Sequence, residues 1–449
     1  MPSAASAQWL TTAFMLTMAV VIPVTGVLLQ RYTLRRNFFT AMGLFAVGSA
    51  VAAFAPTFDV LLVARVVQAL GTSIMLPLLF TTVMQLVAAE KRGRTMGLVA
   101  IVTAAAPALG PTVSGVIVSS LGWQWVFILV LPIAVLAIAG GAVWLRNVTP
   151  TMSARFDVLS VLLSAFGFSG VVYGLASIGE EAGSEGGLPI WVPLSIGIVA
   201  LVALVVRQLA LRETDRVLLD VRVFTGRLFT VSTVMIVTVS ISLFGSLILL
   251  PLYVQQVLGE PAYIAGLMLL PGGLLSGILA PFVGMVYDKV GPRILILPGA
   301  VIATGAMFAF STLGTSTPVG LVIGMHMLLS VGTALMMTPL MTTALGSVAP
   351  KLYSHASAIV NTLQQVAGAA GTALFITLFT VVSTATISGD ALTGLADGVG
   401  TAFRIGGFIS IAGIALALFL RKPDPASTTS PAPGDDQTQT EDAESEVPA

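Results

Sequence analysis

Long apolar stretches follow one another along almost the whole chain, and only short polar segments separate them. A bilayer core about 30 Å thick takes about 20 helical residues to cross, which is close to the length of each stretch. In lipid, only helices and closed barrels satisfy the backbone, and uninterrupted apolar runs lack the alternation of barrel strands. The pattern predicts an all-α polytopic membrane protein with thirteen spans, at residues 9–29, 37–55, 59–87, 95–119, 123–145, 156–177, 189–208, 228–254, 262–286, 294–314, 317–345, 355–382 and 401–420.

Basic residues between these spans fall in alternate loops, which hold eighteen of the twenty lysines and arginines. The intervening loops contain none. Because loops rich in Lys and Arg face the cytoplasm, we expect a cytoplasmic C-terminus and, with thirteen crossings, an N-terminus on the outer side. The residues concerned are Arg31, Arg35, Arg36, Lys91, Arg92, Arg94, Arg146, Arg155, Arg207, Arg212, Arg216, Arg222, Arg227, Lys289, Arg293, Lys351, Arg421 and Lys422.

Composition excludes a soluble globular domain, because 56% of the residues are hydrophobic, 9% are charged and the mean hydropathy is +1.00. The net charge of zero is the sum of an acidic C-terminal segment and a remainder with more basic than acidic residues. Residues 423–449 carry seven acidic and no basic side chains among Pro, Ser, Thr and Gln, which predicts a disordered acidic cytoplasmic tail. The chain has no cysteine, so it forms no disulfide or thiolate metal site.

The chain also repeats itself. Internal repeats are typical of secondary transporters, whose substrate site lies between the two halves near the membrane midplane. Each match is short, but all three occur at nearly the same offset. The matching segments are 71–82 with 332–343 and Gly110 with Gly371, both 261 residues apart, and 26–31 with 284–289, which are 258 apart.

This repeat predicts four parts: an N-terminal helical bundle at 1–146, two inserted transmembrane helices with a linker at 147–227, a C-terminal six-helix bundle at 228–422, and the tail at 423–449. The first bundle has five spans and the second has six, so the span at 228–254 has no partner. We therefore expect that the chain lacks a first helix, which would precede Met1.

Two short loops carry the same arrangement of glycine, polar and basic residues. The segment from Gly26 through Gln30 and Arg31 to Arg36 and the segment from Gly284 through Asp288 to Arg293 resemble the loop signature of the major facilitator superfamily. The resemblance implies close helix packing at the glycines and a latch made by the carboxylate and arginines. Gln30 and Thr33 replace the usual Asp and second Gly in the first copy, so a charged latch is expected in the second half only.

Arg65 lies within a span, with Gln68 and Gly71 one and two turns later. An arginine in lipid costs several kcal/mol, so it should face the bundle interior. The alternative is that it extends to the outer interface. Arg-x-x-Gln-x-x-Gly resembles the superfamily's fourth-helix motif, which implies proton coupling. The repeat places His326 at the equivalent position, where a histidine is either structural or a second proton-carrying group.

Residues Gly110, Pro111 and Gly115 resemble the antiporter motif of exporters in the same superfamily, which implies a kinked, closely packed helix that biases the opening of the site. Asn361, Gln364 and Gln365 place three amides within five residues of one span, where they should line a cavity. With 251–256 and 271–273, these residues resemble the fourteen-span drug:proton antiporter branch, the EmrB/QacA type, and look most like its lincomycin-resistance members. This resemblance covers residues 8 to 420.

Several chemistries are not supported. The chain has no phosphate-binding loop, so ATP hydrolysis is not expected, and two histidines with no acidic cluster provide no metal site. We expect no cofactor, no nucleic acid and no enzymatic activity. No Asp or Glu lies deep in any span. In the branch named above, a buried Asp belongs to the first helix, which we expect to be missing here.

The patterns predict a secondary transporter, and the resemblance implies a proton-coupled exporter of small amphipathic drugs or toxic compounds, working by alternating access in a bacterial cytoplasmic membrane. Arg65, Gln68, His326, Asn361, Gln364 and Gln365 are the candidate substrate and proton pathway. The candidate conformational switch comprises Gly26, Gln30, Arg31, Gly110, Pro111, Gly115, Gly284, Asp288 and Arg293. Two alternatives stay open at this point: an exporter of one dedicated metabolite, and a truncated or non-transporting membrane protein.

Overall fold

The structure is a computed structural model that describes residues 4–147, 157–177, 191–211, 216–385 and 391–422, together with 151, 189 and 214. Among these residues there are only helices and connecting segments. The predicted acidic tail at 423–449 lies outside the described residues, as do Arg155 and Arg212 of the predicted basic loops.

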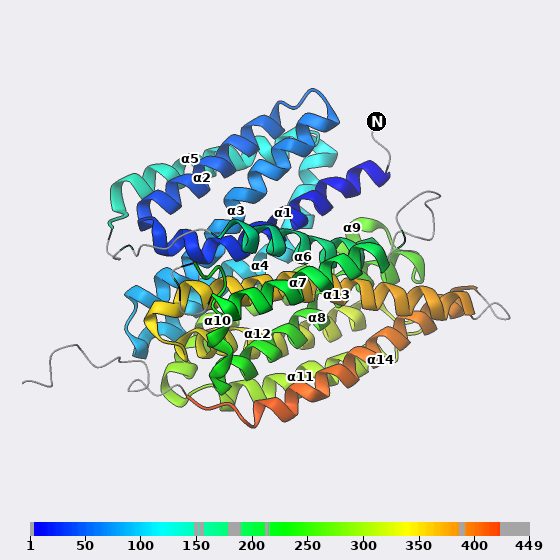
Figure 1. Ribbon diagram of the computed structural model, residues 1–449. Coiled ribbons are helices and arrows are strands. Elements are labelled where there is room, and N and C mark those ends of the chain that lie inside the picture. Colours follow the sequence, from blue (N-terminus) through cyan, green and yellow to red (C-terminus); the bar gives the residue numbers. More distant parts are fainter. Residues whose placement is uncertain are drawn as a thin grey trace, which may run out of the picture.

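Each predicted span corresponds to a helix, and one span is broken into two (Figure 1). Eleven segments of the described chain are long and apolar enough to cross a membrane. The all-α polytopic fold is thus confirmed, while crossing by α2 and α4, which are not among the eleven, stays a prediction. The long helices are α1 (Ala4–Arg31), α2 (Leu34–Ala53), α3 (Phe58–Leu86), α4 (Arg92–Ser120), α5 (Gln124–Trp144), α6 (Val158–Ser177), α7 (Trp191–Ala210), α8 (Arg227–Gln256), α10 (Leu270–Val290), α11 (Arg293–Phe310), α12 (Val319–Gly346), α13 (Tyr353–Ala385) and α14 (Ala391–Ala417).

The broken span contains the short helix α9 (Ala262–Leu267) followed by α10. Pro271 lies in the first turn of α10, where a residue without a backbone N–H is tolerated and where its fixed φ favours a new helix start. The predicted continuous span at 262–286 therefore bends at residues 268–269, next to the cavity described below.

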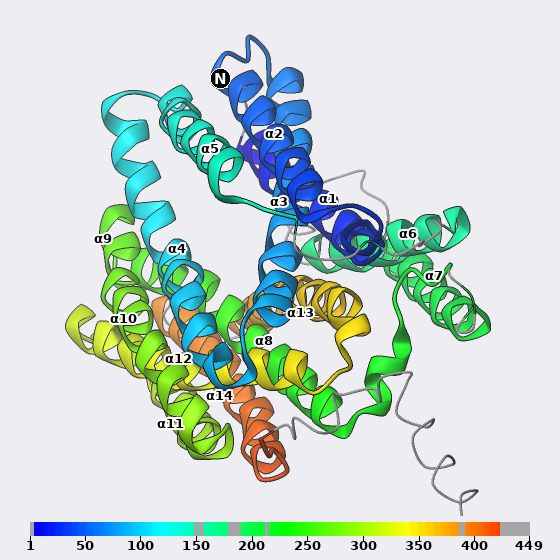
Figure 2. The ribbon, with the colours of Figure 1, turned by 90° about the vertical axis from the view of Figure 1, so that its left-hand side faces the viewer.

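The long helices form two groups. Helices α1, α2, α3 and α5 pack together, and α8 and α10 to α14 form the second group (Figure 2). Helix α4 leaves the first group and lies along α10 of the second, where it makes most of its contacts (Figure 2). Helix α1 likewise lies against α13. Two seams, α4–α10 and α1–α13, therefore join the two halves of the predicted repeat.

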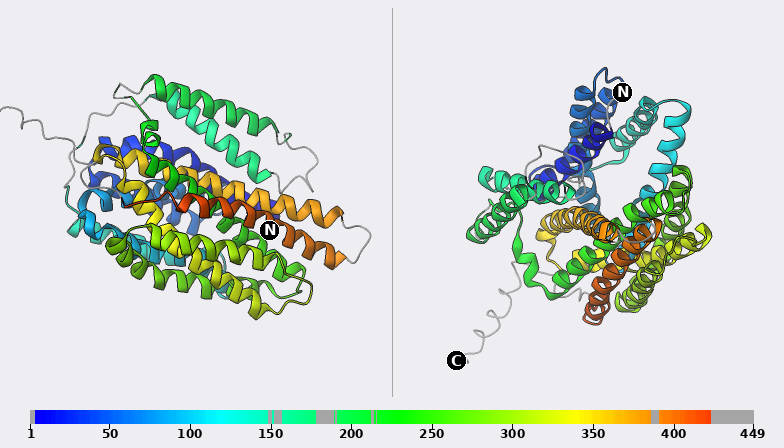
Figure 3. Two further views of the ribbon diagram at one scale, coloured as in Figure 1. Left: turned by 90° about the horizontal axis from the view of Figure 1, so that it is seen from below. Right: turned by 90° about the vertical axis from the view of Figure 1, so that its right-hand side faces the viewer.

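Helices α6 and α7 form a hairpin on the outside of the bundle (Figure 3), where α6 packs against both α1 and α13. At its base, Arg207 donates two hydrogen bonds of 2.6 and 2.7 Å to the carboxylate of Asp157. These bonds, helped by hydrogen bonds from Ser160, hold the pKa of the Asp157 carboxyl well below its usual range. The ion pair therefore persists at any physiological pH.

A second set of contacts fixes the linker that follows α7. The side-chain oxygen of Gln208 accepts hydrogen bonds from the backbone N–H groups of Leu218 and Leu219, at 2.8 and 3.2 Å. Nδ1 of His355, in the first turn of α13, lies 3.2 Å from the carbonyl oxygen of Leu218 and donates to it. Burial would raise the pKa of Asp220 in this linker, but hydrogen bonds from Arg222 outweigh burial and lower it. The inserted hairpin is thereby attached to the α1–α13 seam.

The predicted basic loops meet at one end of the bundle, which we call the basic face. Hydrogen bonds connect them there, among them Arg35 N–H to Asn147, Gln30 to the Lys351 carbonyl, Gly93 and Arg94 N–H to Asp288, and Lys422 to the Asp288 carbonyl. The alternate loops that carry the basic residues in the sequence therefore lie at the same end of the bundle.

Small residues set the spacing of the α4–α10 seam at the basic face. A Cβ atom at Gly284 would collide with the backbone of Gly93, and a Cβ at Gly97 would collide with the carbonyl oxygen of Ala280. Backbones that touch in this way exclude any side chain larger than hydrogen, as is common where membrane helices pack closely. Gly284, predicted from the loop signature as a point of close approach, is one in the structure.

Replacing Gly284 by Ala should therefore force α4 and α10 apart. We expect a drop of several degrees in Tm of the purified protein, since overpacking costs about 1–3 kcal/mol. The control is Gly305→Ala on α11, where nothing lies within 4 Å of an added Cβ. That change should leave Tm unchanged or slightly raised, because Ala is the better helix former. Equal Tm values for the two variants would contradict the close approach.

Candidate functional site

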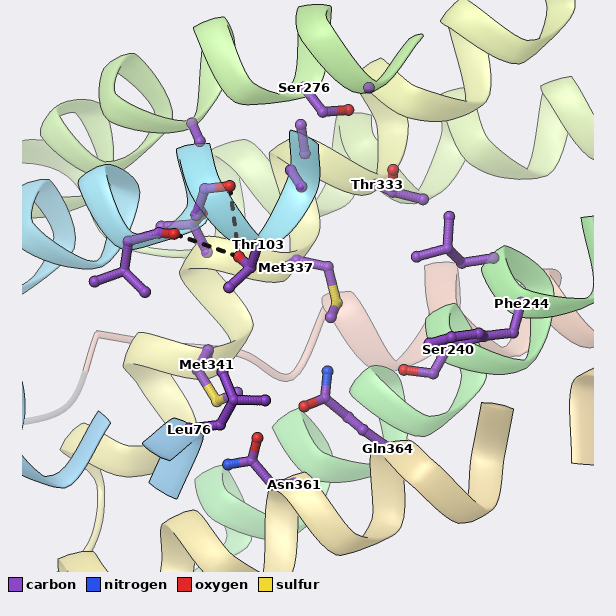
Figure 4. Close-up of a pocket in the computed structure, with 18 of the residues that line it drawn as sticks. Leu76, Thr103, Ser240, Phe244, Ser276, Thr333, Met337, Met341, Asn361 and Gln364 are labelled. Carbon is purple, nitrogen blue, oxygen red and sulfur yellow. Dashed lines mark hydrogen bonds between the residues drawn. The ribbon is translucent and has the colours of Figure 1, made fainter. Parts of the chain in front are cut away.

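A cavity of about 300 Å³ lies between the two halves. The first half contributes α1, α3 and α4, and the second contributes α8, α10, α12 and α13. Asn361 and Gln364 of α13 and Met337 and Met341 of α12 point into the same space (Figure 4). Because both seams border this space, any change in their packing changes the cavity.

The cavity wall is mostly apolar, with uncharged polar groups at intervals. Four methionines and two phenylalanines are among the apolar lining residues, and Met adapts to irregular shapes because it is flexible and polarisable. None of the lining residues that the structure describes is Asp, Glu, Lys or Arg. The polar lining residues are Thr103, Ser240, Ser276, His326, Ser330, Thr333, Thr338, Asn361, Gln364 and Gln365.

Three amides of α13 lie at the cavity, as their spacing predicts. Nδ2 of Asn361 donates a hydrogen bond of 2.8 Å to the carbonyl oxygen of Ser357, one turn earlier. Nε2 of Gln365 lies 3.7 Å from the sulfur of Met18 on α1, across the seam. The side chain of Gln364 points toward Met337 (Figure 4). These amides offer both donors and acceptors to a bound molecule without adding charge.

His326 lines the same cavity from α12, so four of the six predicted pathway residues come together. Arg65 and Gln68 lie elsewhere and are not among the lining residues. The repeat matches Arg65 with His326, but α3 and α12 present these two positions to different surroundings. The roles of all six residues remain predictions.

Arg65 belongs to a polar network inside the first half. Nη1 donates a hydrogen bond of 2.6 Å to Oε1 of Gln68, whose Nε2 donates one of 2.9 Å to Oγ of Ser49 on α2. The guanidinium also lies 4.4 Å from the centre of the Phe14 ring on α1, a favourable cation–π distance. Arg65 thus connects α1, α2 and α3 rather than facing a ligand directly.

At the α4–α10 seam, the carboxylate of Asp288 accepts two hydrogen bonds of 2.8 Å, from the backbone N–H groups of Gly93 and Arg94. These N–H groups belong to the first turn of α4, where the helix carries partial positive charge and has no internal acceptors for them. The predicted latch of the second half therefore holds a helix terminus of the first half. Its partners are backbone groups, with Arg293 only beginning the next helix, α11.

The α1–α13 seam has a weaker counterpart. Nε2 of Gln30 donates a hydrogen bond of 3.2 Å to the carbonyl oxygen of Lys351, just before α13. The guanidinium of Arg31 lies 5.7 Å from the centre of the Tyr32 ring. Thr33, which replaces the motif's second Gly, caps α2 through its hydroxyl, whereas Gly291 in the other copy has φ +82°. The first copy thus needs no glycine there, because its backbone is extended.

The remaining switch residues are less informative. Gly26 packs tightly against His355 and Ala358 of α13, as close packing at this glycine predicts. Gly110 on α4 has nothing within 4 Å of an added Cβ. The side chain of Pro111 and the surroundings of Gly115 lie outside what the structure describes. Three or more potential metal-ligating side chains do not gather anywhere among the described residues.

Sequence reasoning missed several residues that the structure brings to the site. Gly93 and Arg94 donate their backbone N–H groups to Asp288. Because every residue except proline has such a group, the sequence does not indicate which ones bind. Thr103, Ser276 and Thr333 line the cavity, and the signal that could have found them is a hydroxyl on a helix face that also carries small residues.

Removing the charge of the Asp288 latch should loosen the seam. The chain has no cysteine, so Met341→Cys gives a unique reporter inside the cavity. We expect Asp288→Asn to raise its alkylation rate by a bulky polar reagent about tenfold, because two charge-assisted hydrogen bonds are weakened. Asp59→Asn, in the first turn of α3, is the control and should have no effect. Identical rates in both variants would show that Asp288 does not hold the seam closed.

Comparison with known proteins agrees with this architecture. The family model described as Major Facilitator Superfamily matches residues 1–372. "Lincomycin resistance protein LmrB" of Listeria monocytogenes is 39% identical over 427 residues, covering 94% of this chain and 90% of that protein. "Multidrug resistance protein B homolog" of Mycobacterium tuberculosis is 30% identical over 380 residues, covering 83% and 69%. A crystal structure of the human organic anion transporter MFSD10 shares the fold, with a TM-score of 0.61 and 15% identity over 93% of this chain and 86% of that one. The chain is a multi-pass bacterial membrane protein, and it belongs to the Major Facilitator Superfamily.

Proposed function

We propose that this protein exports small amphipathic drugs or toxic compounds across the bacterial cytoplasmic membrane. The observation that carries the proposal is the cavity between the halves, which is mostly apolar and has uncharged hydrogen-bonding groups from several helices. Such a wall accepts varied amphipathic molecules, since few polar contacts must be matched. Relatives whose names include lincomycin and multidrug resistance support this reading.

Export would occur by alternating access, with each half moving largely as a rigid body about the central cavity. In the structure, the Asp288 latch and the Gly93–Gly284 contact close the α4–α10 seam at the basic face. If the basic face is cytoplasmic, as the bias of Lys and Arg predicts, the C-terminus is cytoplasmic too and this arrangement blocks the inner side. Opening the latch would admit cargo from the cytoplasm.

Proton entry would drive export. Arg65 is a partly buried cation that contacts three helices of the first half, so a rearrangement of those helices would change its surroundings. Because it does not line the cavity, its loss should impair transport more than cargo binding. The lipid bilayer and protons are the other partners that this proposal requires.

The test is uptake of lincomycin into inverted membrane vesicles with and without a proton gradient. We expect gradient-dependent accumulation by the unaltered protein. Gln364→Ala should weaken cargo binding about tenfold, the effect of one lost hydrogen bond to a buried ligand. Gln256→Ala, an exposed amide at the end of α8, is the matched control and should transport normally.

Arg65→Ala should bind lincomycin but fail to accumulate it. Lincomycin accumulation that does not depend on the proton gradient would contradict proton coupling. Normal accumulation in Arg65→Ala would contradict the proposed role of Arg65 in transport. Absence of lincomycin transport with transport of a single cellular metabolite would instead favour a dedicated exporter. Absence of any transport would favour a non-transporting membrane protein.

A further inference from the structure

Four cations lie around the α4–α10 seam at the basic face, two at the start of α4 and two at the loop after α10. These residues are exposed and form no ion pair among the residues that the structure describes. The carboxylates of the same two segments, 89–94 and 288–293, are those of Glu90 and Asp288, and Asp288 is already bonded to α4. We call these four residues the seam cations: Lys91, Arg94, Lys289 and Arg293.

The C-terminal segment of the chain starts beside the seam cations. Helix α14 ends at Ala417, and Nζ of Lys422 donates a hydrogen bond of 2.7 Å to the carbonyl oxygen of Asp288. A Cβ atom at Gly291, in the loop after α10, would lie 3.3 Å from Cβ of Lys422. Lys422 is therefore held against this loop, and residues 423–449 continue from there.

The charge and the length of residues 423–449 fit the seam cations. Six of the seven acidic residues of this tail lie within 435–446, and the ten residues before them are uncharged and include three prolines. From Lys422, the thirteen residues to Asp435 cover at most about 45 Å when extended. The axes of two packed helices lie about 8–10 Å apart. The acidic segment 435–446 can therefore reach cations on both sides of the seam.

We propose that the acidic segment 435–446 binds the seam cations of both halves and helps to hold the α4–α10 seam closed. A single exposed ion pair is weak. Several pairs form together here, and the attachment at Lys422 keeps the effective concentration of the acidic segment high. Because the cations belong to α4 on one side and to α10 and α11 on the other, the bound segment opposes separation of the two halves.

The first test measures the distance between the tail and the seam in the full-length protein, in nanodiscs that contain phosphatidylglycerol. Spin labels are attached at Ala443→Cys in the tail and at Ala89→Cys, an exposed position just before α4, in a chain with no other cysteine. We expect a short distance at low ionic strength. At about 0.5 M NaCl the short distance should be lost, because salt screens charges beyond a few ångströms.

Two variants separate the position of the cations from the net charge. Replacing all four seam cations by Gln should abolish the short distance. The matched control makes the same change of net charge at four other exposed residues of the basic face and should keep the short distance. Helix content and Tm verify that both variants are folded. The control substitutions are Arg36→Gln, Arg146→Gln, Arg216→Gln and Lys351→Gln.

The second test measures whether the tail helps to close the seam, with the cavity reporter Met341→Cys. We expect truncation after Lys422 to raise the alkylation rate about fivefold at low ionic strength, since the ion pairs across the seam are lost. At about 0.5 M NaCl the truncated and full-length chains should react at the same rate. Replacing the six carboxylates of 435–446 by amides should act like truncation, because the charge and not the length is required.

A long distance at low ionic strength, or a short one that the Gln variant of the seam cations retains, would overturn the inference. A distance that is short in phosphatidylcholine nanodiscs but long with phosphatidylglycerol would assign these cations to anionic lipid headgroups and would overturn it too. An alkylation rate that truncation leaves unchanged would contradict the effect on closure. Neither readout involves transport, so failure here is distinct from failure of the proposed export function.

Discussion

The architecture depends on the contact between α4 and α10 at the basic face. Gly93 and Gly284 let the two backbones touch, and this places the carboxylate of Asp288 within 2.8 Å of the first N–H groups of α4. An anion at a helix N-terminus is stabilised by the unpaired N–H groups and by the helix dipole. Because α4 makes few contacts with its own half, this anchorage determines where α4 lies and hence one wall of the cavity.

The two seams are related by the repeat but differ in strength. The carboxylate of Asp288, at the end of α10, accepts hydrogen bonds from the start of α4. At the other seam, the neutral amide of Gln30 donates one to the segment before α13. Charge-assisted hydrogen bonds are roughly twice as strong as neutral ones. The weaker seam has other support, since α6 packs against both α1 and α13 and the linker after α7 is bonded to His355. The two seams are therefore supported in different ways, α4–α10 by its own close packing and carboxylate and α1–α13 by neighbouring elements.

Much of this could be predicted from the sequence, because membrane helices leave a strong hydrophobic signal and the repeat fixes which helices correspond. The amides of α13 were placed correctly since i, i+3 and i+4 spacing puts Asn361, Gln364 and Gln365 toward one side of a helix. Other features depend on neighbours that a sequence does not reveal. Arg65 has the spacing of a pathway residue, yet its guanidinium is held by Gln68 and Phe14 away from the cavity. The break between α9 and α10 and the backbone partners of Asp288 likewise emerge only from packing.

The proposed export mechanism requires that the α4–α10 seam opens and closes as the protein works. Its most direct test is the distance between spin labels at Lys91→Cys and Val290→Cys, two exposed positions on either side of that seam, in a chain with no other cysteine. The account predicts one short distance in the closed state and a second, longer distance that becomes populated when lincomycin and a proton gradient are supplied. A single unchanged distance under all conditions, in vesicles that transport lincomycin, would contradict it.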